Sequence, residues 1–176
     1  MMARMAVQLV WFKRDLRTHD HLPLREAALR GPVLPLYIVE PDYWRGADAS
    51  ARHWQVLRES LQELRESLHG LGLPLVIRRG EAVAVLEQLR RELDIAALWS
   101  HEETGNGFTY ARDVQVAGWA KTHGIAWTEI PQFGVVRRLK RRDGWIKQWE
   151  AHMNQPVQPV PVNGAAVQAG RFGFLS

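Results

Sequence analysis

The sequence predicts an α/β protein built on a doubly wound, five-stranded parallel sheet. Short apolar runs of strand length alternate with longer segments in which apolar residues recur at helical spacing, and this order is typical of consecutive βαβ units. The run Val33–Val39 is almost wholly apolar, as expected for a strand covered by helices on both faces. A length of 176 residues suits one domain of ordinary size.

The first half of the chain contains two predicted strands and two predicted helices. Val7–Phe12 forms the first strand, and Pro23 begins a short helix that ends at Gly31. Val33–Val39 forms the second strand. The clearest helix covers Ala51–Leu71, where one apolar stripe consists of Trp54, Leu57, Leu61, Leu64, Leu68 and Leu71.

The second half adds three strands and two helices. In chain order, we expect a strand at Leu75–Ile77, a helix at Glu81–Leu93, a strand at Ile95–Trp99, a helix at Thr109–His123 and a strand at Ile125–Ile130. Val114 and Ala117 are expected to turn toward the core from the second of these helices. After Pro131 the regular pattern fades, and the proline-bearing segment Asn154–Pro161 is interpreted as an extended linker.

The composition excludes several classes of protein. Hydrophobic residues make up 46% of the chain and charged residues 24%, as in soluble globular proteins, and no apolar run approaches the roughly 20 residues of a membrane-spanning helix. No signal peptide is recognised. The absence of cysteine rules out disulfides, thiolate metal sites and a cysteine nucleophile, and it fits a cytoplasmic protein. Glycine-rich dinucleotide fingerprints, Walker loops and nucleophile elbows are also missing, which disfavours conventional nicotinamide and nucleoside-triphosphate enzymes.

One segment, residues 137–147, accounts for the net positive charge of the chain, because its own charge of +5 exceeds the total of +4. It contains a single acid, Asp143, and the six cations Arg137, Arg138, Lys140, Arg141, Arg142 and Lys147. Such a run can contact the phosphate backbone of a nucleic acid. A solvated basic loop is the simpler alternative.

The first candidate site follows the first predicted strand. Lys13, Arg14 and Arg17 lie there together with Asp15 and Asp20. In an open parallel sheet, ligands are usually held at the carboxyl ends of the strands, and arginine can bind phosphate or carboxylate through forked hydrogen bonds. The alternative is that Arg14 and Asp15 form internal ion pairs that shape the loop.

The second candidate site is the loop Ser100–Gly107, after the fourth strand. His101, Glu102 and Glu103 suggest hydrogen bonds to a heterocycle or acid–base chemistry, and Gly105 permits close backbone approach. Adjacent His-Glu-Glu side chains point in different directions, so the loop is a poor metal site. A polar loop that only caps the next helix is the alternative.

A third, weaker candidate lies after the second strand. Tyr43 and Trp44 offer flat surfaces on which a ring could stack, although aromatic residues near a helix start often serve only packing. The chain contains eight tryptophans, and core packing is the preferred explanation for most of them, including Trp54 on the apolar stripe and Trp119.

Several motifs, in the correct order, resemble the amino-terminal domain of the photolyase/cryptochrome family. They are Trp-Phe-Lys-Arg-Asp-Leu-Arg at 11–17 with the following Asp20, the strand 33–39 ending at Pro41, Arg52 with the helix that follows, the run 78–86, Tyr-Ala-Arg-Asp at 110–113 and the segment 141–149. The resemblance covers roughly residues 7–150. It implies an antenna domain over residues 1–150 and a linker or tail at 151–176, leading toward an FAD-binding helical domain that this chain lacks.

The resemblance also implies a function. Members of the family carry a light-harvesting pigment against the loop after strand four, and they bind FAD and DNA through the helical domain. The chain is therefore expected to be a non-catalytic light-harvesting domain that meets DNA only through a full-length protein. It should bind no FAD stably and split no pyrimidine dimers alone. The alternatives are a stand-alone nucleotide- or flavin-binding sensor of the same fold, or a nucleic-acid-binding protein that uses residues 137–147.

The expected pigment follows from a departure from the family pattern. Folate-using members have Asn-Glu where this chain has Phe108-Thr109, which favours a flavin or deazaflavin over folate, or an empty pocket. The residues expected to line the pigment pocket are Phe12, Lys13, Arg14, Tyr37, Ile38, Arg52, Glu102, Glu103 and Gly105.

Overall fold

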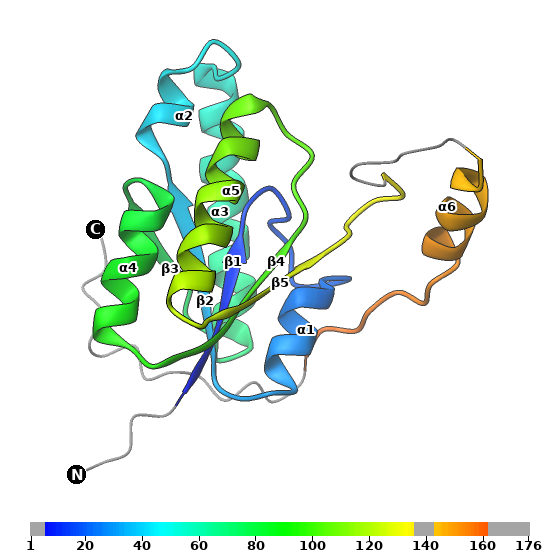
Figure 1. Ribbon diagram of the computed structural model, residues 1–176, viewed down its shortest axis with the longest axis horizontal. Helices are drawn as coiled ribbons and strands as arrows, with labels where there is room; N and C mark the ends of the chain where they lie inside the picture. The colour runs from blue at the N-terminus through cyan, green and yellow to red at the C-terminus, as the bar shows by residue number, and fades with distance from the viewer. Residues whose placement is uncertain (1–5, 136–142, 162–176) are drawn as a thin grey trace.

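A computed structural model describes residues 6–135 and 143–161 of the chain. Five parallel strands form one sheet in the order β3-β2-β1-β4-β5, which confirms the predicted fold class (Figure 1). The strands are β1 Val7–Phe12, β2 Val33–Val39, β3 Val76–Arg79, β4 Ile95–His101 and β5 Ala126–Ile130. The chain winds from β1 out to β3 and returns to β4 on the other side of β1. The topological switch point therefore lies between β1 and β4, where ligands bind in folds of this type.

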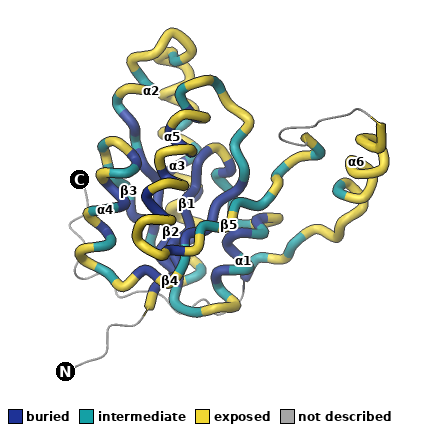
Figure 2. The backbone as a smooth tube through the Cα atoms, viewed as in Figure 1, coloured by how far each residue is buried: buried dark blue, intermediate teal, exposed yellow. Residues whose placement is uncertain are grey.

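Helices cover both faces of the sheet. The described helices are α1 Leu22–Ala28, α2 Pro41–Arg45, α3 Ala51–Gly70, α4 Ala82–Glu92, α5 Gly107–Thr122 and α6 Trp145–Met153. Successive side chains of a strand point to opposite faces, so Leu9 and Trp11 join the core under α4 and α5, whereas Val10 and Phe12 join the core under α1 and α3. Buried residues accordingly concentrate in β1, β2 and β4, whereas the edge strand β5 has no buried residue and α6 is largely exposed (Figure 2). None of the described helices is long and apolar enough to cross a membrane.

Local capping explains where several helices begin. The Ser50 hydroxyl accepts the backbone N–H of His53 at the start of α3, and Glu81 accepts two N–H groups at the start of α4. Asn106 accepts the N–H of Thr109 at the start of α5, so the loop after β4 does cap the next helix. Helix α2, which the sequence pattern did not predict, begins with Pro41 at a position where a missing N–H costs nothing.

The buried face of α5 differs from the prediction. Val114 is 52% exposed and Ala117 is also exposed, whereas Val116 and Trp119 pack into the core. The apolar spacing was misleading because the same buried face carries a charged residue, Arg112, whose partners lie on other elements. A hydrophobicity pattern cannot identify this face as the buried one, because it assigns the charged Arg112 to solvent and does not include the partners that Arg112 meets in the tertiary structure.

Two other expectations are corrected. On α3, Leu61, Leu64 and Leu68 are buried, but Trp54 is 38% exposed and packs edge-on against Trp44, with ring centroids 5.0 Å apart. Strand β4 runs two residues further than predicted because Ser100 and His101 pair with β5. His101 therefore belongs to the sheet and not to the loop.

The segment after β5 contains a helix that the sequence pattern missed. Helix α6 runs through residue 150, which the sequence takes as a domain boundary, and that boundary stays a prediction. The segment 155–161 has no helix or strand, and Gln158 ties it to the body of the domain through hydrogen bonds with Asp20 and Arg25. Most of the basic run, residues 137–142, lies outside the described residues.

Candidate functional site

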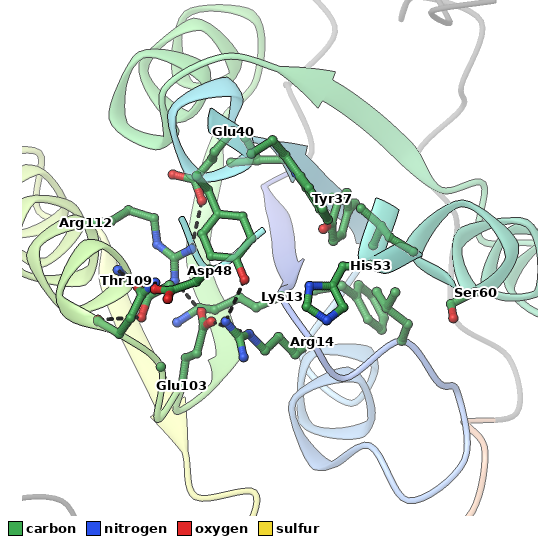
Figure 3. A pocket seen from close by; sticks show the side chains of 18 of the residues that line it. Lys13, Arg14, Tyr37, Glu40, Asp48, His53, Ser60, Glu103, Thr109 and Arg112 are labelled. Atoms are coloured by element: carbon green, nitrogen blue, oxygen red, sulfur yellow. Dashed lines mark hydrogen bonds and ion pairs between the residues drawn. The ribbon is translucent and has the colours of Figure 1, made fainter. Parts of the chain in front are cut away.

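A cavity of about 730 Å³ lies at the carboxyl ends of β1, β2 and β4 (Figure 3). We call it the switch-point pocket. It is bounded by the end of β1, the end of β2, helices α2 and α3, and the β4–α5 loop with the first turns of α5. Its described lining residues are Trp11, Phe12, Lys13, Arg14, Leu16, Tyr37, Ile38, Glu40, Tyr43, Trp44, Asp48, Arg52, His53, Val56, Leu57, Ser60, Glu103, Thr104, Gly105, Asn106, Thr109 and Arg112. Its size and mixed aromatic and polar lining are those of a small-molecule site.

A buried arginine holds one wall of the pocket together. The Arg112 guanidinium donates to Glu40 at 2.8 Å, to Glu103, and to Asp113 at 2.9 Å, and it lies 4.8 Å from the centre of the Trp11 ring. Burial opposes the charge of Arg112, but the three carboxylates outweigh it and raise the pKa of the guanidinium. Burial also raises the pKa of Glu40, although Arg112 opposes this effect. These charges satisfy one another within the protein.

Lys13 is also committed to internal contacts. Its side chain is 4% exposed, and its Nζ lies 3.1 Å from Asp113 and 3.5 Å from Glu129. The same ammonium sits against two rings, 4.8 Å from the centre of Trp11 and 5.3 Å from that of Trp127. Lys13 lines the pocket, but its charge is turned toward the protein.

Arg14 spans the mouth of the pocket. Its Nε lies 2.8 Å from Glu103, and its Nη2 donates to the Tyr43 hydroxyl at 3.0 Å. A second bridge crosses the mouth where Asn106 donates to Asp48 at 2.6 Å. The two bridges connect the α2–α3 region to the β1 and β4 loops, and each joins an exposed side chain to a partly exposed one.

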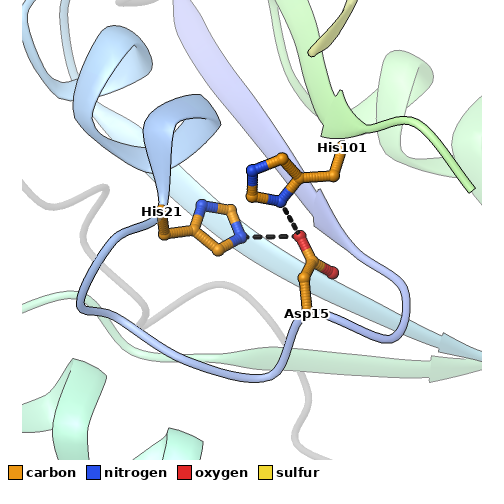
Figure 4. Close-up of side chains that lie close together, drawn as sticks. All are labelled: Asp15, His21 and His101. Atoms are coloured by element: carbon orange, nitrogen blue, oxygen red, sulfur yellow. Dashed lines mark hydrogen bonds and ion pairs between the residues drawn. The ribbon is translucent and has the colours of Figure 1, made fainter. Parts of the chain in front are cut away.

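Asp15 belongs to a separate buried cluster (Figure 4). Its Oδ2 lies 2.7 Å from His21 Nε2 and 2.6 Å from His101 Nδ1, and its Oδ1 accepts the backbone N–H of Lys13. Burial raises the pKa of Asp15, but the hydrogen bonds from His101 and His21 outweigh it and hold that pKa well below its usual range. Because an ionised carboxylate only accepts, both imidazoles donate to Asp15.

The three ligand atoms of this cluster lie within 4.8 Å of one another, close enough to consider a metal ion. His21 argues against this, because its Nδ1 accepts the backbone N–H of Leu24 and the proton must then sit on Nε2. A metal ion bound to Nε2 would require the proton of the neutral ring to sit on Nδ1, where it would face the backbone N–H of Leu24 and break that hydrogen bond. The cluster fits a hydrogen-bonded network better than a metal site.

His21 should make stability depend on pH. Burial lowers its pKa below the ordinary value of about 6.5, so the unfolded chain binds more protons than the folded one just below that pH. Stability is then fully present above pH ~6.5 and falls by up to about 1.4 kcal/mol per pH unit as the pH drops toward the folded pKa. Urea unfolding between pH 7.5 and 5.0 measures this slope.

The matched variant for the pH experiment is His21→Asn, which keeps an amide donor and an acceptor but has no titrating ring. Its slope between pH 6.5 and 5.0 should be shallower than that of the unmodified chain. His19→Asn changes an exposed neighbour and serves as the control. Equal slopes in all three proteins would contradict the assignment to His21.

The structure brings eight of the nine predicted pigment-site residues to the switch-point pocket: Phe12, Lys13, Arg14, Tyr37, Ile38, Arg52, Glu103 and Gly105. Glu102 instead lines a smaller adjoining cavity of about 270 Å³. That any of these residues binds a pigment stays a prediction. The residues of the first two candidate sites do not stay together in the structure. His101, from the second candidate site, binds Asp15 of the first, and Arg17 donates to the Asp20 carbonyl outside the switch-point pocket.

Other lining residues were missed by sequence reasoning. Helix α3 contributes His53, Val56 and Ser60, which follow helical spacing beside the predicted stripe and could have been found from it. Arg112 was noted only as part of a motif. The Asp48–Asn106 bridge joins residues 58 positions apart and has no local signal.

A doubly wound sheet with a ligand-sized pocket at the ends of its central strands defines the class as an open α/β domain, a fold that usually holds ligands at this edge. The family model for DNA photolyase matches residues 8–137 of this sequence. The chain belongs to the DNA photolyase family.

Known proteins agree with this assignment. A cryptochrome DASH of Gloeobacter violaceus is 38% identical over 116 residues, which cover 62% of this chain and 23% of the relative. The crystal structure of a class III photolyase from Agrobacterium tumefaciens superposes with a TM-score of 0.74 at 24% identity, covering 96% of this chain and 36% of that one. An archaeal photolyase from Sulfolobus tokodaii, described with two FAD molecules and a novel light-harvesting cofactor, gives 0.70 at 21% identity, covering 92% and 38%. The chain thus spans about a quarter of the relative and under half of each structure.

Proposed function

We propose that this chain is the light-harvesting domain of a photolyase or cryptochrome and that it binds its antenna pigment in the switch-point pocket. The observation that carries the proposal is the pocket itself: about 730 Å³, at the ligand-binding edge of the sheet, with aromatic and aliphatic walls. Trp44, Ile38 and Leu57 offer apolar surface to a planar ring. The three buried carboxylates are matched by the three cations Arg112, Lys13 and Arg14, so they present little repulsion to an anionic ligand.

The mouth of the pocket supports a pigment with an anionic tail. Arg52 and His53 line it, and their side chains form no hydrogen bond or ion pair with a described residue. An arginine without an internal partner is suited to bind a phosphate. We infer that the ring lies against the apolar wall and that a phosphate-bearing tail reaches Arg52.

The beginning of α5 supports a flavin or deazaflavin over a folate. Phe108 packs against Tyr43, with ring centroids 5.9 Å apart, and the Thr109 hydroxyl donates to the Asn106 carbonyl. Neither side chain supplies the amide or carboxylate expected of folate-using members at these positions. The archaeal neighbour described with two FAD molecules gives a further reason to test flavins first.

The catalytic steps are assigned to a longer protein. We propose that FAD and DNA are bound by a helical domain attached to residues 151–176, as the partial coverage of the relatives supports. The light-harvesting domain then passes excitation to that FAD. We also propose a cytoplasmic location, in keeping with a chain that has no cysteine.

The test is titration of the purified chain with FMN, riboflavin, 8-hydroxy-5-deazariboflavin and methenyltetrahydrofolate, followed by absorption and fluorescence. We expect stoichiometric binding of a flavin or deazaflavin. Leu57→Trp should weaken binding at least about tenfold by filling the pocket, and Arg52→Ala should weaken FMN while leaving riboflavin unchanged. Leu29→Ala, at the exposed residue that follows α1, is the control.

Two results would contradict the proposal. One is the absence of binding by every pigment; the other is binding that Leu57→Trp leaves intact. The same preparation, given FAD, light and dimer-containing DNA, should leave the dimers uncleaved. Cleavage by this chain would show that it is catalytic by itself.

A further inference from the structure

A second cavity lies on the other side of the β1–β4 ends, against helix α6. It measures about 570 Å³, and we call it the α6 groove. Its lining includes the aromatic side chains of His101, Phe133, Trp145 and Trp149. Contacts with Gly134 position the two tryptophans. Trp145 Nε1 donates to the Gly134 carbonyl at 3.2 Å, and Trp149 lies so close to Gly134 that a Cβ there would overlap its ring. The aromatic wall of the groove is therefore fixed by backbone contacts.

A buried imidazole opens into this groove. His101 is 5% exposed, and its Nδ1 donates to Asp15. Its Nε2 points away from the carboxylate and makes no hydrogen bond with any described residue (Figure 4). No described side-chain nitrogen or oxygen is both fully buried and unpartnered, so this Nε2 must reach open space. His101 and Phe133 line both this groove and the adjoining cavity of about 270 Å³, so Nε2 opens into the space that these two cavities border.

The chemistry of the free nitrogen follows from its partner. With the proton held on Nδ1 by Asp15, Nε2 carries a lone pair and accepts a hydrogen bond. A metal ion would need further protein ligands, and the only cluster of suitable side chains within the described residues uses the opposite nitrogen, Nδ1. The groove therefore has a buried acceptor at His101, in a lining that also includes the aromatic rings of Phe133, Trp145 and Trp149.

We propose that the α6 groove binds a planar heteroaromatic molecule that stacks on Phe133, Trp145 or Trp149 and donates an N–H to Nε2 of His101. A groove of this volume, lined by aromatic rings together with polar side chains such as Asp20 and Gln132 and the oriented imidazole of His101, has the composition of a small-molecule site. The site is separate from the switch-point pocket and does not depend on the proposed pigment.

Two xanthines test the proposal. Theophylline carries an N–H at the position where caffeine carries an N–methyl group, so the two rings stack alike and only theophylline donates. In isothermal titration calorimetry, theophylline should bind at least about tenfold more tightly than caffeine. His101→Asn retains an amide donor for Asp15 and loses the acceptor at Nε2, so this variant should bind the two xanthines equally.

Two further variants keep the experiment decisive. Phe133→Ala removes an exposed part of the wall without touching Asp15, so it should weaken both xanthines even if His101→Asn fails to fold. Trp44→Ala alters only the switch-point pocket and should change neither affinity. The proposal is overturned if theophylline does not bind, if caffeine binds equally well, if the preference persists in His101→Asn, or if Trp44→Ala abolishes it.

Discussion

Replacing Arg112 with methionine is expected to lower the free energy of unfolding by about 3–5 kcal/mol, since removing the central cation of a buried ion network leaves Glu40 without a cation and weakens the pairing of the other carboxylates. Glu40, Glu103 and Asp113 all bind this guanidinium, and their side chains are all less than a tenth exposed. Without it, Asp113 keeps Lys13 and Glu103 keeps Arg14, whereas Glu40 has no other cation among the described residues. Methionine has similar bulk, so the loss arises from the stranded carboxylates and not from a cavity.

Urea unfolding at pH 7.5 measures the change in the free energy of unfolding caused by Arg112→Met. In thermal unfolding, the same variant should show a melting temperature lowered by roughly 10 °C in a protein of this size. Arg112→Lys keeps the positive charge but loses the planar guanidinium that donates to several carboxylates at once, so it should recover only part of the lost stability. Arg91→Ala removes a surface arginine whose side chain is 74% exposed, and it should cost little. A loss no larger than that of Arg91→Ala would show that the network contributes little to stability.

The Arg112→Met variant should also respond to pH in a characteristic way. Burial raises the pKa of Glu40 even with the arginine in place, and without Arg112 its pKa rises further. A moderate decrease in pH then protonates Glu40 and relieves part of the repulsion. The difference in stability from the unmodified chain should therefore narrow between pH 7.5 and 5.5.

Asp15→Asn is expected to cost about 3 kcal/mol, because one buried carboxylate accepts hydrogen bonds from two imidazoles and a backbone amide. An asparagine amide places donors where the imidazoles already donate. His21 cannot change its tautomer without losing the cap of α1, in which its Nδ1 accepts the N–H of Leu24. At least one donor is left unsatisfied in the core.

Chemical denaturation of Asp15→Asn, with Asp42→Asn as an exposed control, checks this cost. Nitrogen-15 NMR of the imidazoles gives independent evidence, since the unmodified chain should show protonated Nε2 on His21 and protonated Nδ1 on His101. The opposite tautomers, or a stability change equal to that of the control, would disprove the network.

The elements of the sheet could be predicted closely because their signals are local. The bounds of β1 and β2 agree with the prediction, since continuous apolar runs such as Val33–Val39 mark strands buried on both faces. Helix α5 could not be oriented in this way. Its inner face includes Arg112, a residue that a hydrophobicity pattern places in solvent.

The sequence predicted the position of the candidate site and several of its residues, but not the contacts that those residues make. The position of the pocket follows from the strand order, which places the ends of β1, β2 and β4 at one edge of the sheet. The family motif supplied Arg14 and its neighbours. Lys13, Arg14 and Asp15 are neighbours in the sequence, but their side chains lie in three different places: Lys13 inside the protein, Arg14 at the mouth of the pocket and Asp15 in the histidine cluster. The sequence could not predict this, because each side chain pairs with a residue on another element.

The sequence by itself determined the fold class, the strands of the sheet and the edge of the sheet where the pocket lies, because hydrophobic periodicity and the βαβ order can be recognised from consecutive residues. Only the tertiary structure decided which charges meet. Lys13 contacts Asp113 across 100 positions, Asp15 contacts His101 across 86 and Arg112 contacts Glu40 across 72. Such pairs form because a parallel sheet gathers the carboxyl ends of its strands at one edge, where burial makes each charge require a partner.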